Sequence, residues 1–248
     1  MPRVVGAETL DHLAAQHPAA RRSRRDLVRV HRMMGTRGIL ASGWRTLLGE
    51  RRDTAPLRIL EIGAGDGTLL LGVARRLAPT WPQVELTLLD RLDIVGAATL
   101  AGYAQLGWTV RVEVADALDW AAGCAAVGAQ TRAPVPAPTW DLVSCALFLH
   151  HFEGAQLLGL LAGIASCTDR FFACEPQRSW RALLGSHLVG AIGANAVTRG
   201  DAVLSVHAGF RDGEITAHWP SDGSAWQCAE FPARLFSHCF SARRSRAN

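Results

Sequence analysis

The chain has 248 residues, of which 49% are hydrophobic, and this is enough for one domain with a sizeable core. Its formal net charge of +4 is too small to indicate a nucleic-acid partner, although every basic residue is an arginine. The six cysteines include no Cys-x-x-Cys pair and the histidines show no zinc-binding spacing, so we expect reduced thiols and no metal site. The first residues lack the apolar core of a secretion signal, and no run is long enough for a membrane span, so we expect a cytoplasmic protein.

Residues 1–55 form an extension in front of the first predicted strand. Apolar residues recur at helical spacing in 26–34 and again in 39–48, so the extension is expected to be mostly helical. Two interpretations are open: the helices cover a ligand cleft, or they pack on the edge of the sheet.

The segment from Leu57 to Thr68 carries the strongest local signal. A short apolar strand, 57–62, runs into three glycines at alternate positions, and a helical pattern follows over 69–77. This order of elements holds a nucleotide-like ligand against the N-terminus of the helix. The dinucleotide fingerprint needs a glycine where Thr68 stands, and a phosphate-binding loop needs a lysine, which the chain lacks.

Acidic residues follow the next two strands. Strand 84–90 ends at Asp90, about 20 residues beyond the glycines, where a carboxylate commonly binds the two hydroxyls of a ribose. The alternative is that Asp90 caps the helix predicted over 92–106. Strand 109–114 leads to Asp116. Capping of the following helix is nearly as good an interpretation of this acid as a ligand-binding role, and one residue can do both.

A pair of histidines follows the fourth strand. The proline-rich stretch 128–138 predicts an extended surface loop, and a strand over 140–148 leads directly to His150 and His151. Ligands of open parallel sheets lie outside the carboxyl ends of the strands. A histidine there can accept a proton from a phenol or hydroxyl, or can hold the cleft wall by bonding to backbone. We expect one of the two to be a site residue, and the sequence does not choose between them.

Glu175 reaches the same edge of the sheet from the fifth strand. A helix is predicted over 155–166 and the strand over 170–176. Glu175 can bind substrate, act as a base, or form a structural pair with Arg178 or Arg181.

The apolar segment 179–197 predicts one helix, followed by a polar turn at 195–201. This helix either packs as a core or lid element or lines a hydrophobic substrate pocket. The alternating segments 226–231 and 235–243, joined by 232–234, predict a closing β-hairpin.

Taken together, residues 57–243 resemble a class I S-adenosylmethionine-dependent methyltransferase. The resemblance rests on the glycine spacing Glu61-x-Gly63-x-Gly65-x-Gly67, on the acids at the strand ends and on the closing hairpin. A bacterial small-molecule methyltransferase group shares the Met-Gly-Thr, Leu-Phe-Leu-His-His-Phe and Ser-Val-His-Ala-Gly-Phe segments of this chain.

The fold implied by the resemblance is α/β, with a Rossmann-like, seven-stranded, mostly parallel sheet closed by an antiparallel C-terminal hairpin strand. A helical N-terminal cap would occupy residues 1–55. A single methyltransferase domain would occupy 56–248, with a lid insert at about 178–222.

The resemblance also implies S-adenosyl-L-methionine as the cofactor. Asp116, followed by the small Ala117, would bind the adenine amino group. Arg91 departs from the apolar residue that many relatives carry, and its aliphatic stem would cover the adenine ring. The candidates for catalysis are His150, His151 and Glu175. The residues implied to contact the cofactor are Glu61, Gly63, Ala64, Gly65, Gly67, Asp90, Arg91, Asp116, Ala117 and Ala146.

The implied reaction is methyl transfer to the oxygen or carbon of a small hydrophobic or aromatic metabolite of secondary metabolism. Direct attack on the sulfonium methyl needs mainly alignment of two bound reactants. A nucleic-acid methyltransferase is a rival, but its Asn/Asp-Pro-Pro-aromatic segment is replaced here by Leu-Phe-Leu-His-His. A cofactor-binding but inactive partner subunit is the other rival. Neither the acceptor nor the oligomeric state can be predicted.

Overall fold

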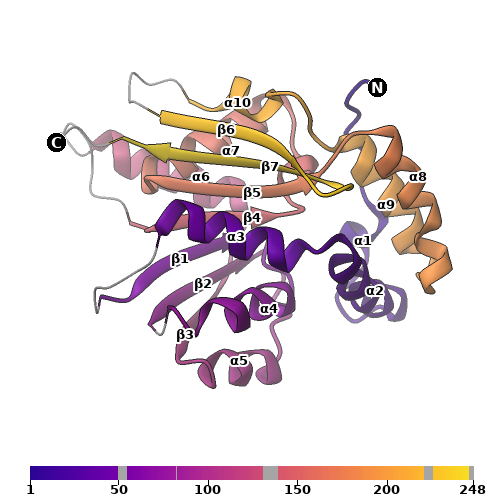
Figure 1. The fold of residues 1–248 in the computed structure, drawn as a ribbon, viewed down its shortest axis with the longest axis horizontal. Coiled ribbons are helices and arrows are strands. Elements are labelled where there is room, and N and C mark those ends of the chain that lie inside the picture. The colour runs from indigo at the N-terminus through magenta and orange to yellow at the C-terminus, as the bar shows by residue number, and fades with distance from the viewer. Residues whose placement is uncertain (50–54, 82, 131–138, 221–225, 246–248) are drawn as a thin grey trace.

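The computed structural model shows a sheet with helices on both faces (Figure 1). Most of the proline-rich loop predicted at 128–138 lies outside the residues that the structure describes. Those residues are 1–49, 55–81, 83–130, 139–220 and 226–245.

The sheet has seven strands in the order β3-β2-β1-β4-β5-β7-β6. The strands from β3 to β5 pair in parallel, whereas β7 pairs antiparallel with both β5 and β6. This confirms the predicted mostly parallel sheet with an antiparallel strand from a C-terminal hairpin. The strands are β1 (Leu57–Ile62), β2 (Val84–Asp90), β3 (Trp108–Val114), β4 (Leu142–Ala146), β5 (Arg170–Pro176), β6 (Trp226–Ala233) and β7 (Ser237–Arg244).

Three of these strands, β1, β2 and β5, have the predicted bounds, because each is a buried apolar run with clear breakers on either side. The fourth is shorter than predicted. Leu147 adopts a left-handed backbone, with φ 54°, which ends β4 at Ala146. The chain then enters the 3₁₀ turn η1 (Leu149–His151), so the histidine pair lies on a turn just beyond the strand.

The two faces of the sheet carry separate hydrophobic clusters. Ile59 of β1 belongs to one cluster and its neighbour Leu60 to the other, as expected for side chains that alternate across a strand. Helix α5 begins later than the predicted residue 92, because the Leu92 amide bonds to the Asp90 carboxylate instead. One face is covered by α3 (Thr36–Leu48), α4 (Thr68–Leu77) and α5 (Ala97–Ala104), and the other by α6 (Ala117–Gln130), α7 (Gly154–Cys167) and α10 (Glu214–His218).

A group of helices lies beyond the carboxyl ends of the parallel strands (Figure 1). Within it, α1 and α2 pack against α9. Its members are α1 (Thr9–His12), α2 (Pro18–Met34), α8 (Trp180–Leu188), η2 (Val189–Ile192) and α9 (Ala196–Ala208). We call this group the helical layer.

The N-terminal extension is therefore divided between the helical layer and one face of the sheet. Helices α1 and α2 join the helical layer, whereas α3 packs on the sheet, where Trp44 is fully buried. The indole nitrogen of Trp44 donates a hydrogen bond of 3.1 Å to Ser144 Oγ in β4. The division of the chain at residue 55 into cap and domain stays a prediction.

The single helix predicted over 179–197 is wrong. Helix α8 ends at Leu188, and Gly193, with φ 78°, closes the short η2 turn. Asn195 then starts α9, because its side-chain oxygen accepts a hydrogen bond from the Thr198 amide at 2.9 Å. The polar turn expected at 195–201 is consequently the first part of α9.

The hairpin connection predicted at 232–234 is displaced. The turn occupies residues 234–236, and Arg234 takes the left-handed conformation there, with φ 58°. Pro232 lies inside β6, which tolerates it because this strand is at the edge of the sheet.

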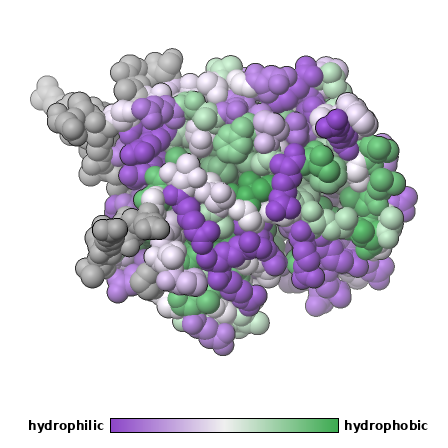
Figure 2. Space-filling view, viewed as in Figure 1, coloured by the Kyte–Doolittle hydropathy of each residue, from purple (hydrophilic) through white to green (hydrophobic). Residues whose placement is uncertain are grey.

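Helix α8 exposes large hydrophobic side chains, Trp180, Leu184 and Leu188. Figure 2 shows hydrophobic residues gathered over this end of the molecule. Among the helices in the described ranges, none is long and apolar enough to cross a membrane.

Candidate functional site

A cavity of about 820 Å³ lies between the carboxyl ends of the parallel strands and the helical layer. Its lining comes from the glycine turn after β1, from the ends of β2, β3 and β4, from the N-terminal segment, and from α2, η1, α8 and α9. This volume lies in the upper part of the range of ligand pockets, which commonly measure about 300–1,000 Å³. The cavity therefore has room for a nucleotide-sized ligand beside a smaller molecule.

The glycine turn forms one end of this cavity. Gly63, Ala64 and Gly65 line it. Gly63 has φ 71°, and a Cβ atom there would clash with the ring of Phe148, so only glycine fits. Gly67 does not line the cavity: it begins α4, and its carbonyl accepts a hydrogen bond of 2.8 Å from Tyr103 Oη.

Asp90 connects the end of β2 to the glycine turn. Its Oδ2 accepts a hydrogen bond of 2.8 Å from the Gly65 amide, and its Oδ1 accepts one of 2.9 Å from the Leu92 amide. The carboxylate lines the cavity. A carboxylate has about four lone-pair sites, so two remain for a diol of the ligand. The capping interpretation is wrong, because α5 begins at Ala97 with Gly96 as its N-cap and the bond to Leu92 lies outside that helix, whereas the ribose role stays a prediction.

Asp116, Ala117 and Ala146 also line the cavity. Asp116 lies just before α6, and its Oδ1 accepts a hydrogen bond of 2.8 Å from the Leu118 amide, as an N-terminal capping residue does. Arg91 lines the rim of the cavity, where its guanidinium donates to the backbone oxygen of Asp11 at 2.8 Å and to the Asp11 carboxylate at 3.0 Å.

The structure places Glu61 inside the sheet and away from the cavity lining. The hydroxyl of Ser144 donates to Glu61 Oε2 at 2.5 Å. Burial raises the pKa of Glu61 to about 8, so the side chain is mostly a neutral acid at pH 7. Glu61 supports the strand beneath the glycine turn.

His150 is buried between two carboxylates. Its Nδ1 lies 2.8 Å from Glu175 Oε2 and its Nε2 lies 3.3 Å from Glu8 Oε1. Burial alone would lower the pKa of His150, but hydrogen bonds to Glu175 and Glu8 raise the pKa to about 9. His150 is therefore a cation at neutral pH and cannot serve as a base.

Glu175 is fully buried and does not line the cavity. Besides the bond to His150, its Oε1 accepts hydrogen bonds from the amides of Phe148 (3.0 Å) and Leu149 (2.9 Å). Arg178, one of its expected partners, pairs with Glu214 instead. Glu175 thus holds the η1 turn and orients His150.

His151 lies in the lining of the cavity, with its ring 4.2 Å from that of His150 between centroids. Its Nδ1 is 3.4 Å from Asp11 Oδ2. Burial, together with the positive charge of His150, lowers the pKa of His151. At neutral pH it is the uncharged histidine of the pair, and its ring can accept a proton.

Two acidic residues of this site, Glu8 and Asp11, were missed by the sequence analysis. They belong to the N-terminal segment, residues 1–12, which is fixed to α9 by two amides that bond to the Asp201 carboxylate at 2.8 and 3.0 Å. Glu8 also accepts a hydrogen bond from Ser205 Oγ. Arg3 donates to the carbonyl of Phe152 at 2.8 Å, directly after η1. No local pattern marks these contacts, because the side-chain partners of Glu8 and Asp11 lie 80 or more residues away in the chain.

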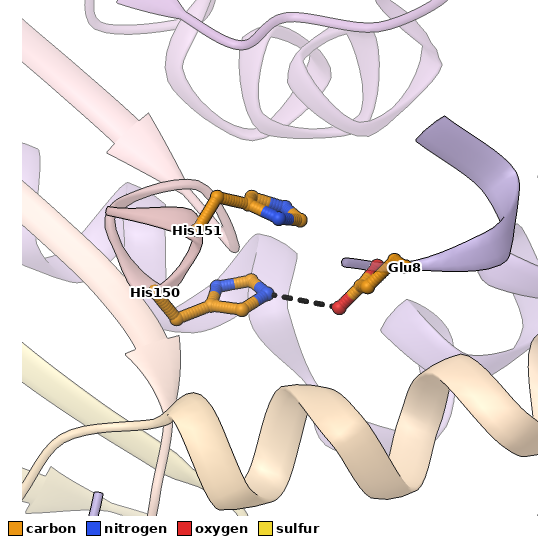
Figure 3. A group of neighbouring side chains, drawn as sticks. All are labelled: Glu8, His150 and His151. Atoms are coloured by element: carbon orange, nitrogen blue, oxygen red, sulfur yellow. Dashed lines mark hydrogen bonds and ion pairs between the residues drawn. The ribbon is translucent and has the colours of Figure 1, made fainter. Parts of the chain in front are cut away.

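Figure 3 shows how Glu8, His150 and His151 point toward one another from opposite walls. The two imidazoles come from η1 and the carboxylate from the N-terminal segment. We call these three residues the His–Glu cluster.

No protein-family model matches the chain, and a search of curated proteins finds no significant match. Solved structures do share its fold. The plantazolicin methyltransferase BpumL in complex with SAH superposes with a TM-score of 0.60 at 13% identity, over 93% of this chain and 92% of that one. An O-methyltransferase family protein from Burkholderia thailandensis gives 0.56 at 15% identity, over 96% and 67%.

The mitomycin 7-O-methyltransferase MmcR gives a TM-score of 0.58 at 17% identity, over 97% of this chain. This chain covers 61% of MmcR. At such identities the likeness establishes the fold alone: the chain has the fold of the class I methyltransferases.

Proposed function

We propose that the chain is an S-adenosylmethionine-dependent methyltransferase that acts on a small hydrophobic acceptor. The observation that carries the proposal is one continuous cavity, which runs from the glycine turn and the strand-end acids to His151 and the apolar helical layer. Methyltransferases are among the solved structures with this fold, and one of them holds SAH.

The cofactor would occupy the sheet side of the cavity. Asp90 would bind the ribose hydroxyls with its two remaining lone pairs, and Asp116 would accept a hydrogen bond from the adenine amino group. The backbone of Gly63, Ala64 and Gly65 would lie against the amino-acid part, and Arg91, Ala117 and Ala146 would flank the ligand. Glu61 and Gly67 would support this turn without touching the cofactor.

The acceptor would occupy the side of the cavity that faces the helical layer. Leu27 and Met34 of α2, Leu188 of α8 and Ile192 of η2 line it there. Such a lining favours an apolar or aromatic acceptor. Two of the solved structures are named as methyltransferases of plantazolicin and of mitomycin, and we propose a comparable small-molecule role in secondary metabolism.

For a hydroxyl acceptor, the oxygen would attack the sulfonium methyl carbon while its proton passes to His151. The carbon–sulfur bond breaks with its electron pair on sulfur, which leaves S-adenosylhomocysteine and the methyl ether. Asp11 would hold His151 Nδ1 as the N–H tautomer, so that Nε2 accepts the proton. Alignment of the two reactants supplies most of the acceleration, and the base a further factor of about 10²–10⁴.

Incubation of the protein with methyl-labelled cofactor and a small-molecule extract tests this activity. We expect at least one metabolite that gains one labelled methyl group, and none with heat-inactivated protein. Label transferred only to added DNA or RNA would favour the nucleic-acid rival. Absence of any labelled product, with cofactor binding intact, would favour the inactive partner subunit.

A further inference from the structure

The His–Glu cluster has the geometry of a metal site. One ligand atom from each of Glu8, His150 and His151 lies within 4.8 Å of the other two, and His150 Nε2 is 3.3 Å from Glu8 Oε1 (Figure 3). Ligand atoms around a tetrahedral Zn²⁺ are about 3.3 Å apart, because the metal–nitrogen and metal–oxygen bonds measure about 2.0–2.2 Å. The other two separations, at most 4.8 Å, exceed this by up to about 1.5 Å and would have to shorten on metal binding.

A carboxylate holds Nδ1 of His150, which faces away from Glu8, and another lies beside Nδ1 of His151. Glu175 Oε2 lies 2.8 Å from His150 Nδ1, and Asp11 Oδ2 lies 3.4 Å from His151 Nδ1. Histidines that bind metals almost always donate their second nitrogen to such a partner, which fixes the ring and makes it a better ligand. Glu175 is itself fixed by two backbone amides, so the aim of His150 at Glu8 is built into the fold.

The charges around the cluster also favour a cation. Glu8 and Glu175 are both hydrogen-bonded to the same imidazole, which can neutralise only one of them. Asp11 adds a third carboxylate beside His151, and Arg91 contacts it only from the exposed rim. The Arg3 guanidinium, which donates to the His150 carbonyl at 3.3 Å, is a further cation beside the cluster, and a divalent ion that displaces the proton of His150 would keep these carboxylates paired in a poorly solvated place.

We propose that Glu8, His150 and His151 bind a divalent cation of the zinc type, with an open coordination position toward the cavity. Two imidazoles and one carboxylate suit Zn²⁺, Co²⁺ or Fe²⁺ better than Mg²⁺, which prefers oxygen ligands. Three protein ligands with an open fourth position are typical of zinc ions that contact a substrate. The ion would also fasten the N-terminal segment over the cavity, because Glu8 comes from that segment.

Binding of the ion does not depend on the proposed function. If the chain is a methyltransferase, the ion would hold the acceptor oxygen and lower its pKa so that its proton is lost to water, and His151, as a ligand of the ion, would not accept the proton in the loaded protein. Only this catalytic role of the ion rests on the proposed activity.

The test is calorimetric titration of Zn²⁺ into the full-length, tag-free protein after treatment with a chelator. We expect one ion per chain for the wild type and for the control His187→Ala, which removes an exposed histidine outside the cavity lining. Glu8→Gln, which preserves size but removes the ligand charge, should weaken binding at least tenfold. His151→Asn should do the same, and circular dichroism should show that both variants are folded.

Co²⁺ absorption gives an independent reading of the same site. The wild type should show the intense visible bands of a four- or five-coordinate ion, and Glu8→Gln should lose them. Absence of binding, or equal binding by the wild type, Glu8→Gln and His151→Asn, would overturn the proposal. SAH binding is measured on the same samples. Loss of metal binding with intact SAH binding would contradict the metal site alone, and absence of SAH binding with intact metal binding would contradict the proposed function alone.

Discussion

Glu175 Oε2 lies 2.8 Å from Nδ1 of His150, and this pair joins the end of β5 to the turn after β4. Both side chains are buried, and the second nitrogen of His150 faces Glu8 of the N-terminal segment. The pair therefore connects the sheet edge to the segment that covers the cavity. Its protonation state therefore affects the stability of the fold.

Stability should fall at alkaline pH because of His150. Its pKa is about 9 in the folded protein, against about 6.5 in an unfolded chain, so the stabilisation is complete below pH 6.5 and is lost as the pH rises through 9. The loss amounts to roughly 3 kcal/mol. Urea unfolding at pH 6, 7.5 and 9.5, with a chelator present, measures it. In Glu8→Gln the decline should be smaller, and an identical decline would contradict the assignment.

Glu61 provides a separate test of burial, in a lower pH range. Its pKa is raised to about 8, so the folded protein keeps a proton that the unfolded chain releases near pH 4.5, and stability falls as the pH rises between these values. Glu61→Gln keeps the neutral shape and removes this loss, so its stability relative to wild type should increase from pH 5 to pH 8, by roughly 3–4 kcal/mol. Unfolding midpoints over that range report the difference. A constant difference would mean that Glu61 is already ionised in the fold.

Gly63→Ala should disrupt the glycine turn. The residue has φ 71°, and the added methyl group would clash with the ring of Phe148, so we expect a destabilisation of about 1–3 kcal/mol and loss of SAH binding. Gly123→Ala in α6 is the matched control, because nothing lies near its Cβ position, and it should stabilise by about 0.5–1 kcal/mol. Thermal unfolding and calorimetry measure both. Normal SAH binding by Gly63→Ala would show that the turn does not hold the cofactor.

His151→Asn should slow methyl transfer by about 10²–10⁴-fold. SAH affinity should stay within about twofold, since the cofactor contacts that we propose come from Asp90, Asp116 and the glycine turn and not from His151. His187→Asn is the control and should leave turnover unchanged. An unaltered rate in His151→Asn would move the proton acceptor elsewhere in the cavity.

Buried strands were the most predictable part of the fold. The runs 57–62, 84–90 and 170–176 are bounded by glycine, proline or charged residues, and both faces of each are covered. The break between α8 and α9 was missed because alanine and valine continue the helical pattern on both sides of it. Gly193 and Asn195 carried the signal, as a helix end followed by an N-cap.

The site was only partly predictable for a different reason. Asp90, Asp116 and the histidine pair follow strands, and parallel strands bring their carboxyl ends together, so their convergence could be expected. Glu8 and Asp11 reach the site through contacts with α9, which depend on tertiary packing. Glu61 belongs to the glycine motif, but the inward direction of its side chain toward Ser144 depends on the register with β4.

The most direct test of the central claim is calorimetric titration of S-adenosylhomocysteine into three proteins. The wild type should bind one equivalent. Asp90→Ala should lose binding by at least about 100-fold, because the carboxylate both holds the Gly65 amide and faces the ligand. Asp93→Ala, which removes an exposed carboxylate of the same loop that does not line the cavity, should bind like the wild type. Binding of NAD in place of SAH, or equal SAH affinity in Asp90→Ala, would contradict the account.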